Sequence, residues 1–190
     1  FDRFTYRPDD PSSIGGNAIT SIFGASNGAL WIGVFDGGLS RMQTGSDGQF
    51  TRFVHDPADP KSLSGNRVLT VAEDRSGQIW VGTEGRGLNR LRADASGFDR
   101  VDIESVVVSD GTDPVSGTPW EIHEASDGAL WIGTLGQGLL RWSAEDRDRG
   151  RPRFEPFGVT EGLSGEIYGI VEGAAGELWL SSSRGLFQFE

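Results

Sequence analysis

Apolar and polar residues alternate along this chain in a pattern that occurs four times. Each copy reads apolar, Trp, apolar, small residue, then a polar turn, then Gly-Leu. The copies are "ALWIGVFDGGLSRM", "GQIWVGTEGRGLNRL", "ALWIGTLGQGLLRW" and "ELWLSSSRGLFQF", centred on Trp31, Trp80, Trp131 and Trp179. Because these Trp residues are separated by 49, 51 and 48 positions, the chain is a repeat protein in which each copy is one supersecondary unit.

The second copy predicts four short strands. Alternation of period two and glycine-rich turns place them at 68–73, 78–83, 87–92 and 98–103. Three hairpins then join the strands into one antiparallel sheet. Approximate repeat units follow at 1–49, 50–97, 98–153 and 154–190, and the first two match at a constant shift of 49 residues.

Four-stranded sheets that repeat at this period are typical of β-propeller blades. The predicted fold is therefore an all-β β-propeller built of four-stranded antiparallel blades, with the whole chain as one domain or propeller segment. The four repeated Trp side chains are expected to fill the space between neighbouring blades. Because the chain starts with Phe rather than Met, it is expected to be an excerpt or a processed product.

Ring closure is open at this point. Phe1–Tyr6 has the pattern of a fourth strand, and the last copy ends at its third strand, Gly185–Phe189. Pairing between these two segments would cover the open edge, either within one chain or between two chains. The alternatives are thus a closed ring of four blades, half of a dimeric ring, or a segment of a larger propeller.

Composition narrows the classes of partner. The net charge of −11 disfavours nucleic acid and anionic membrane surfaces, and 29 glycines suit a chain of tight turns. Cysteine is absent, which excludes disulfides and thiol chemistry. No apolar run reaches the roughly 18 to 20 residues of a membrane span.

The stretch "DPKSLSGNRVLTVAEDRSGQIWVGTEGRGLNRL" resembles the two-component regulator propeller repeat, and the likeness extends over nearly the whole chain as four copies. The resemblance implies a periplasmic input region of a bacterial membrane-bound sensor, ahead of a histidine kinase or diguanylate cyclase, usually with seven blades. This chain departs from that pattern in having four copies, in Ser181 at the position of the glycine after Trp, and in containing no output domain.

Catalytic chemistry finds little support in the sequence. His55 and His123 occupy unlike positions of the repeat, which indicates a structural role for each and no metal pair. Carboxylates gather in turns, where they usually bond to their own backbone: Asp9, Asp10, Asp56, Asp59, Asp94 and Asp127. Asp110–Asp113 loosely resembles a Ca²⁺ loop but lacks the distal Glu. We predict no catalytic residue, no metal site and no cofactor.

Residues that break the repeat are the better candidates for function. Arg41, Arg90 and Arg141 recur in three copies and are predicted to be scaffold. Loops that enter the first strand and turns that join the second and third strands gather on one face of a propeller, around the channel. The candidate ligand-binding residues on this face are Trp120, Tyr168, Phe35, Asp36, Glu84, Arg86, Gln137 and Arg184.

Aromatic surface with mixed charge suits a sugar, a peptide or a small metabolite, whereas the structural alternative is that Trp120 and Tyr168 plug the channel mouth. The function predicted for the chain is a non-catalytic ligand-sensing or interaction module in the periplasm. The alternatives are a propeller-type carbohydrate-active enzyme or lyase, and a structural segment that forms a homodimer.

Overall fold

A computed structural model describes residues 1–103, 117–157, 162, 163 and 165–189. The predicted Ca²⁺-like loop, Asp110–Asp113, lies outside these residues. The chain divides into two compact units. Unit 1 contains residues 1–84 and 89–100, and unit 2 contains residues 85–88 and 101–190.

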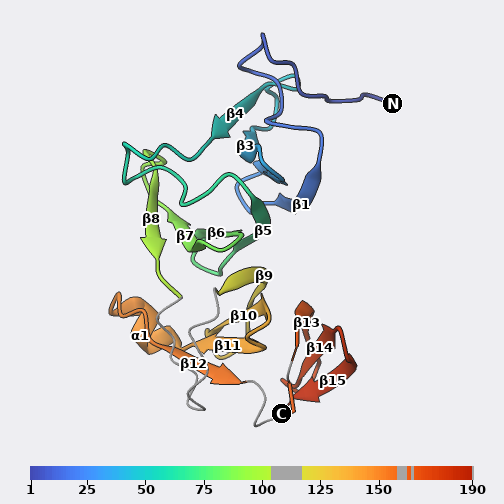
Figure 1. Ribbon diagram of the computed structural model, residues 1–190, viewed down its shortest axis with the longest axis vertical. Helices are drawn as coiled ribbons and strands as arrows, with labels where there is room; N and C mark the ends of the chain where they lie inside the picture. Colours follow the sequence, from blue (N-terminus) through green and yellow to red (C-terminus); the bar gives the residue numbers. More distant parts are fainter. Residues whose placement is uncertain (104–116, 158–161, 164, 190) are drawn as a thin grey trace. The chain divides into compact units, whose positions relative to one another are not determined.

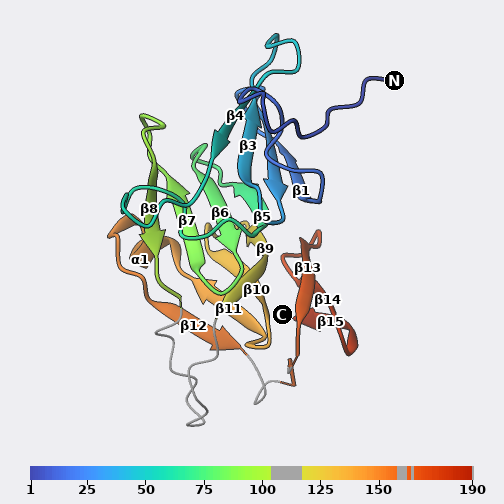
Figure 2. The same cartoon turned by 45° about the horizontal axis from the view of Figure 1, so that its top comes forward.

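Two sheets begin the chain, each with its four strands in sequence order (Figures 1 and 2). The strands of the first are β1 (Ile19–Gly24), β2 (Leu30–Val34), β3 (Gly38–Met42) and β4 (Phe50–Phe53). Those of the second are β5 (Val68–Glu73), β6 (Ile79–Thr83), β7 (Gly87–Leu91) and β8 (Phe98–Val101). The four strands predicted for the second copy are thereby confirmed to within two residues at each end.

The second half of the chain repeats this arrangement. The third sheet contains β9 (Thr118–Glu124), β10 (Leu130–Leu135), β11 (Leu139–Trp142) and β12 (Phe154–Phe157). Its last two strands are joined through one short helix, α1 (Ala144–Asp148), whose N-cap is Ser143. The fourth sheet has three strands among the described residues, β13 (Ile167–Glu172), β14 (Leu178–Ser182) and β15 (Gly185–Phe189). The fold is thus nearly all-β and built from four antiparallel sheets, as predicted.

The first hairpin of every sheet turns through a glycine at the same position of the repeat. Gly28, Gly77, Gly128 and Gly176 have φ values of 82°, 83°, 82° and 89°. This left-handed backbone conformation strains any side chain with a Cβ. The constant spacing between each Trp and the preceding glycine therefore follows from the left-handed backbone conformation that the turn requires.

The core of each unit lies between its two sheets. In unit 1, Trp31 is 2% exposed and packs in one cluster with Val68, Val71 and Ile79 of the next sheet. In unit 2, Trp131 is 6% exposed and packs in a cluster with Ile167 and other aliphatic residues of the fourth sheet. The prediction that the repeated Trp fills the space between neighbouring sheets is confirmed at these positions.

The same prediction is wrong for Trp179. Its side chain is 37% exposed, and Val171 and Leu186 of the same sheet are 64% and 69% exposed. Trp31 and Trp131 are buried because a following sheet covers their face, and among the described residues no further sheet covers the corresponding face of β14. Burial of the repeated Trp depends on a neighbour, which its own sequence motif cannot supply.

The N-terminal segment also differs from expectation, because residues 1–6 form no strand. Phe4 packs on Phe50 at 5.6 Å between ring centroids, and the Tyr6 N–H donates to Asn17 Oδ1. One repeat later, the His55 N–H donates to Asn66 Oδ1 in the same way. Side chains of the loop that follows therefore fix this segment. The predicted pairing of Phe1–Tyr6 with Gly185–Phe189 would join residues of the two units, or of two chains, and stays a prediction.

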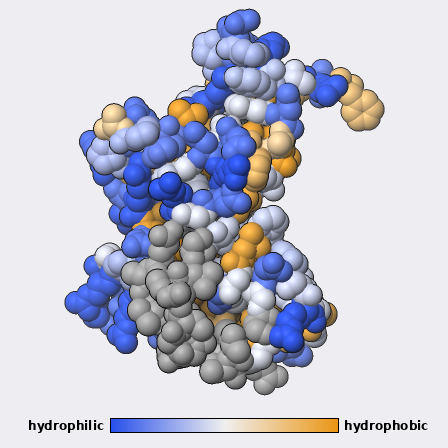
Figure 3. Space-filling view, in the orientation of Figure 1, coloured by the Kyte–Doolittle hydropathy of each residue, from blue (hydrophilic) through white to orange (hydrophobic). Residues whose placement is uncertain are grey.

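The face drawn in Figure 3 is mostly hydrophilic, and apolar side chains appear on it in small separate groups. This distribution agrees with the net charge of −11. Buried apolar side chains gather in clusters between the sheets of each unit.

Candidate functional site

The first strand of every sheet has an irregular register at one shared position. The pairing shifts between Ile19 and Ser21 in β1, and the equivalent shifts occur in β5, β9 and β13. The residues at these bulges are Thr20, Leu69, Trp120 and Tyr168. Because a bulge re-aims the side chain that it carries, this position can vary without disturbing the ladder. The residues that break the sequence repeat most clearly therefore sit where the sheet tolerates variation.

In unit 2 the two aromatic bulge residues meet. Trp120 and Tyr168 pack edge to face with ring centroids 6.1 Å apart, and their exposed fractions are 38% and 42%. Together with Glu121 and Glu166, they are called the aromatic bulge site below. Large rings that stay this exposed offer apolar contact area at a low cost in conformational entropy.

Tyr168 has a carboxylate beside its ring, and Trp120 has a Glu next to it in the sequence. The Tyr168 hydroxyl donates to Glu166 Oε2 at 2.9 Å, and this bond raises the pKa of Tyr168. Glu121 follows Trp120 directly, and burial raises the pKa of its carboxyl to about 7. Among the described residues, Glu121 forms no side-chain hydrogen bond or ion pair.

Glu121 was not among the residues predicted from the sequence. Its counterparts in the other three sheets are Ser21, Thr70 and Gly169, so a carboxylate occurs at this position in β9 alone. The Ser21 hydroxyl accepts the Val71 N–H of the neighbouring strand β5 at 3.2 Å. An alignment of the four sequence copies already shows that a carboxylate occurs in one copy alone. Only the strand register, however, identifies Glu121 and its counterparts as equivalent positions.

Three of the predicted residues meet in unit 1, through an arginine that sequence reasoning missed. Arg67 forms ion pairs with Asp36 and Glu84, each at 2.7 Å, and its guanidinium lies 4.8 Å from the centre of the Phe35 ring. The two carboxylates raise the pKa of Arg67 further. One guanidinium and two carboxylates leave the cluster with a formal charge of −1, and exposed ion pairs of this kind contribute little to stability.

The remaining predicted residues lie in turns. Gln137 is 6% exposed, and its backbone N–H donates to the Thr134 hydroxyl, so it supports the turn between β10 and β11. Arg86 and Arg184 are exposed, and the Arg184 N–H donates to the Ser182 hydroxyl.

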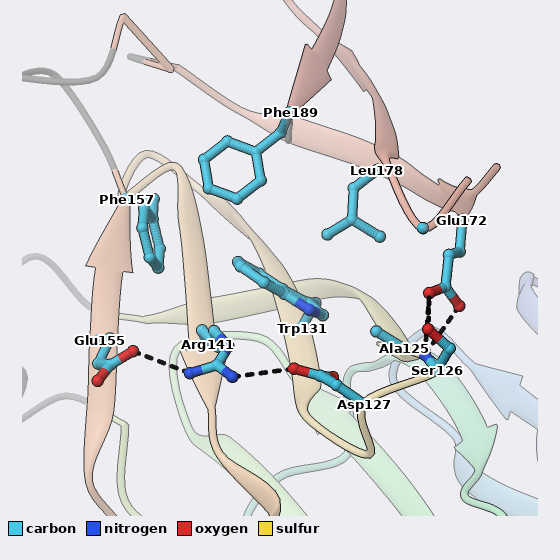
Figure 4. Close-up of a pocket in the computed structure, with 11 residues that line it drawn as sticks. Ala125, Ser126, Asp127, Trp131, Arg141, Glu155, Phe157, Glu172, Leu178 and Phe189 are labelled. Atoms are coloured by element: carbon cyan, nitrogen blue, oxygen red, sulfur yellow. Dashed lines mark hydrogen bonds and ion pairs between the residues drawn. The ribbon is translucent and has the colours of Figure 1, made fainter. Parts of the chain in front are cut away.

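A separate cavity of about 420 Å³ lies between the two sheets of unit 2 (Figure 4). Trp131, Phe157, Phe189 and Leu178 form its apolar walls. The Arg141 guanidinium carbon lies over the Trp131 ring, 5.7 Å from the ring centre.

The polar groups of this cavity are all engaged. Arg141 bonds to Asp127 at 2.9 Å and to Glu155 at 3.1 Å, as the dashed lines in Figure 4 mark. On the other side, the Ser126 N–H and hydroxyl donate to Glu172. Ser26 and Glu73 make the same contact in unit 1, at 2.7 Å for each bond. Because this Ser–Glu contact recurs in both units, it indicates a scaffold role. The sequence predicted the same kind of role for Arg141.

The structural role predicted for the six turn carboxylates is confirmed for five of them. In these five, the side chain accepts a hydrogen bond from the backbone N–H two residues further along the chain: Asp10, Asp56, Asp59, Asp94 and Asp127. His55 Nδ1 lies 2.7 Å from the Leu63 carbonyl oxygen, which confirms its packing role at the strand end. Within the described ranges, no group of three or more His, Cys, Asp or Glu residues could hold a metal ion.

Four antiparallel sheets in series, each with a bulged first strand and with a buried Trp between the two sheets of each unit, define the blades of a β-propeller. Residues 62–85 match the family model of the two component regulator propeller. The resemblance seen in the sequence is thus confirmed at the second copy. No curated protein matches the chain, and no helix in the described part of the chain is long and apolar enough to cross a membrane.

Solved structures support the same fold. The extracellular domain assigned to the hybrid two component system BT3049 from B. thetaiotaomicron is similar over 97% of this chain, with a TM-score of 0.77 and 24% identity. The extracellular domain assigned to the hybrid two component system BT4673 is similar over 92%, with a TM-score of 0.74 and 25% identity. The chain spans 24% of the length of each.

A different propeller is also similar. Catalytically inactive virginiamycin B lyase from Staphylococcus aureus, solved with quinupristin, matches 97% of this chain and 57% of its own length, with 17% identity and a TM-score of 0.62. Likeness at this identity shows the fold alone. The similar structures therefore include both signalling domains and an enzyme.

Proposed function

We propose that this chain is a non-catalytic ligand-sensing module of a bacterial signalling protein, located in the periplasm, and that the aromatic bulge site is where it binds its ligand. The observation that carries this proposal is the pairing of two exposed aromatic rings on adjacent bulges, where the other sheets have Thr20 and Leu69. The similarity to extracellular domains of hybrid two component systems supports the signalling role.

The chemistry of the site suits a sugar, a peptide or a small metabolite. Ring faces and edges contact apolar C–H surfaces, and the carboxylates of Glu121 and Glu166 can accept hydrogen bonds from hydroxyl or amide groups. The net charge of −11 disfavours nucleic acid and anionic membrane surfaces as partners.

Binding by substituted proteins tests the proposal. A panel of neutral and charged oligosaccharides and short peptides is screened by calorimetry, and any hit is then measured against Trp120→Ala and Tyr168→Ala. We expect each substitution to weaken binding at least about fivefold, because an aromatic contact at the centre of a site is worth more than about 1 kcal/mol. Thr20→Ala, at the same bulge of the first sheet, is the matched control. Unchanged affinity in both aromatic variants would exclude this site.

Catalysis is the second candidate, and one observation favours it. A carboxyl with a pKa of about 7 can both take and give a proton at neutral pH, and Glu121 has such a pKa. A propeller lyase is among the similar structures. Turnover of a bound ligand that disappears in Glu121→Gln, with binding retained, would replace the non-catalytic proposal.

Self-association is the third candidate function. Val171, Trp179 and Leu186 form an exposed apolar face on the fourth sheet, and a homodimer is one assembly that would cover it. A concentration-dependent mass in sedimentation equilibrium that Trp179→Ser abolishes would support this role.

A further inference from the structure

Unit 1 contains its own cavity between sheets, of about 350 Å³, at the position of the repeat that corresponds to the cavity in Figure 4. Trp31, Arg41 and Asn27 line it from the first sheet, and Ser76, Gln78 and Arg92 line it from the second. Arg41 and Arg141 are therefore equivalent residues in equivalent cavities. The sequence predicted the same scaffold role for both.

Their electrostatic surroundings differ. Arg141 lies opposite Glu155 across the strand pair and bonds to both Glu155 and Asp127. Arg41 lies opposite Thr51, and Asn27 takes the place of Asp127. Among the described residues, the Arg41 guanidinium makes no hydrogen bond or ion pair, and its Nε is buried without an acceptor.

Two further donors in the walls of this cavity lack an acceptor. The Trp31 indole N–H is buried without one, whereas the equivalent Trp80 donates to Asp74 Oδ2 at 2.8 Å. Ala25 stands where the second sheet has Asp74, so the acceptor is missing in the first. Arg92 bonds to Asp99 through one amino group, but its buried Nε also has no acceptor in the described part of the chain.

Unpaired donors of this kind are costly. A buried N–H without an acceptor costs about 1 to 3 kcal/mol, and native proteins contain few of them. Three buried N–H donors without an acceptor in the walls of one cavity are best explained by a ligand that supplies hydrogen-bond acceptors. The nearby carboxylates cannot do so, because Asp99 is engaged by Arg92 and Glu73 accepts the N–H and the hydroxyl of Ser26.

We propose that this cavity binds a compact oxyanion, that is, a carboxylate, sulfate or phosphate group, and that Arg41 is its principal cationic ligand. The Arg41 guanidinium carbon lies over the rings of Trp31 and Phe53, 5.6 Å from each ring centre, so two cation–π contacts hold the group in place. A guanidinium held in this way suits two-point bonding to an oxyanion. This site is separate from the aromatic bulge site and does not rest on the function proposed above.

Nuclear magnetic resonance of the ¹⁵N-labelled chain tests the proposal. Sodium sulfate, phosphate and acetate are titrated separately, with chloride held as the balancing salt at constant ionic strength. We expect a saturable shift of the Trp31 indole and Arg41 Nε resonances with at least one of the three anions. The anion that binds tightest identifies the class of group that the cavity recognises.

Three variants locate the effect. Arg41→Gln removes the cation, and Asn27→Asp keeps Arg41 but recreates the carboxylate pairing that Asp127 gives Arg141. Both should weaken anion binding about tenfold or more, because a charge-assisted hydrogen bond is lost or already occupied. Arg141→Gln is the matched control and should change the affinity less than about twofold.

Two results would overturn the proposal. One is a linear, unsaturable shift with all three anions, which would reduce the effect to general screening. The other is equal weakening by Arg41→Gln and Arg141→Gln. If Arg41→Gln does not fold, Asn27→Asp decides alone, because it changes neither the cation–π contacts of Arg41 nor the size of the side chain.

Discussion

Burial of the repeated Trp between sheets can be tested by comparing Trp131→Ala with Trp179→Ala. The two residues occupy the same position of the repeat and belong to the same unit, but their exposed fractions are 6% and 37%. Trp131 also packs against Phe157 and Phe189, with ring centroids 5.4 and 5.5 Å away. Trp179 therefore serves as an internal control for the chemistry of the substitution.

The expected magnitude follows from the buried area. A Trp side chain buries about 150–250 Å², which at about 25 cal/mol per Å² corresponds to about 4–6 kcal/mol. Measured truncations of buried Trp or Phe cost about 3–5 kcal/mol, and we expect this loss for Trp131→Ala. Trp179→Ala should cost about 2 kcal/mol less, since part of the ring is already in water and solvent can fill the space that it leaves.

Urea denaturation followed by far-ultraviolet circular dichroism measures both losses without using Trp fluorescence as the probe. The midpoint and the slope are fitted separately, so that a change in cooperativity is not mistaken for a change in stability. Equal losses for the two variants, or a loss below about 1 kcal/mol for Trp131→Ala, would refute the assignment of Trp131 to an inter-sheet core.

Two further predictions concern single buried groups. Trp80→Phe keeps an aromatic ring but removes the hydrogen bond to Asp74 Oδ2. It should lower the free energy of unfolding, measured by urea denaturation, by about 1–3 kcal/mol. An unchanged free energy of unfolding would show that this hydrogen bond is unimportant for stability. Glu121→Gln should stabilise the protein at pH 7.5 but not at pH 4. Burial raises the pKa of Glu121 in the folded state from its ordinary value of 4.5 to about 7, so the folded state holds a proton that the unfolded state has lost. Stability therefore falls as the pH rises from about 4.5 to 7. Parallel stability profiles of wild type and variant over this range would contradict the raised pKa.

Much of the fold could be predicted from the sequence because its main determinants are local. Period-two alternation and glycines at fixed spacing set the strands and hairpins, and Gly77 shows why the spacing is strict. Helix α1 was missed because it is a short insertion between β11 and β12 that has no counterpart in the other copies. The exposure of Trp179 could not be predicted, since it depends on which sheet follows.

The candidate site was predicted only in part. Trp120 and Tyr168 stood out because they break the repeat, and the structure brings them together. Glu121 and Arg67 were missed, because their roles depend on a bulged register and on contacts between loops. The recurrence of Arg41 and Arg141 at one position of the repeat predicted the same role for both residues. Of these two, however, only Arg141 has carboxylate partners among the described residues.

Binding of ligand at the aromatic bulge site can be followed through the indole N–H resonances of the six Trp residues during a titration with a ligand found by screening. We expect the Trp120 resonance to shift and to saturate with the measured affinity, while those of the buried Trp80 and Trp131 remain unchanged. A saturable shift of other Trp resonances with that of Trp120 unmoved would contradict binding at this site.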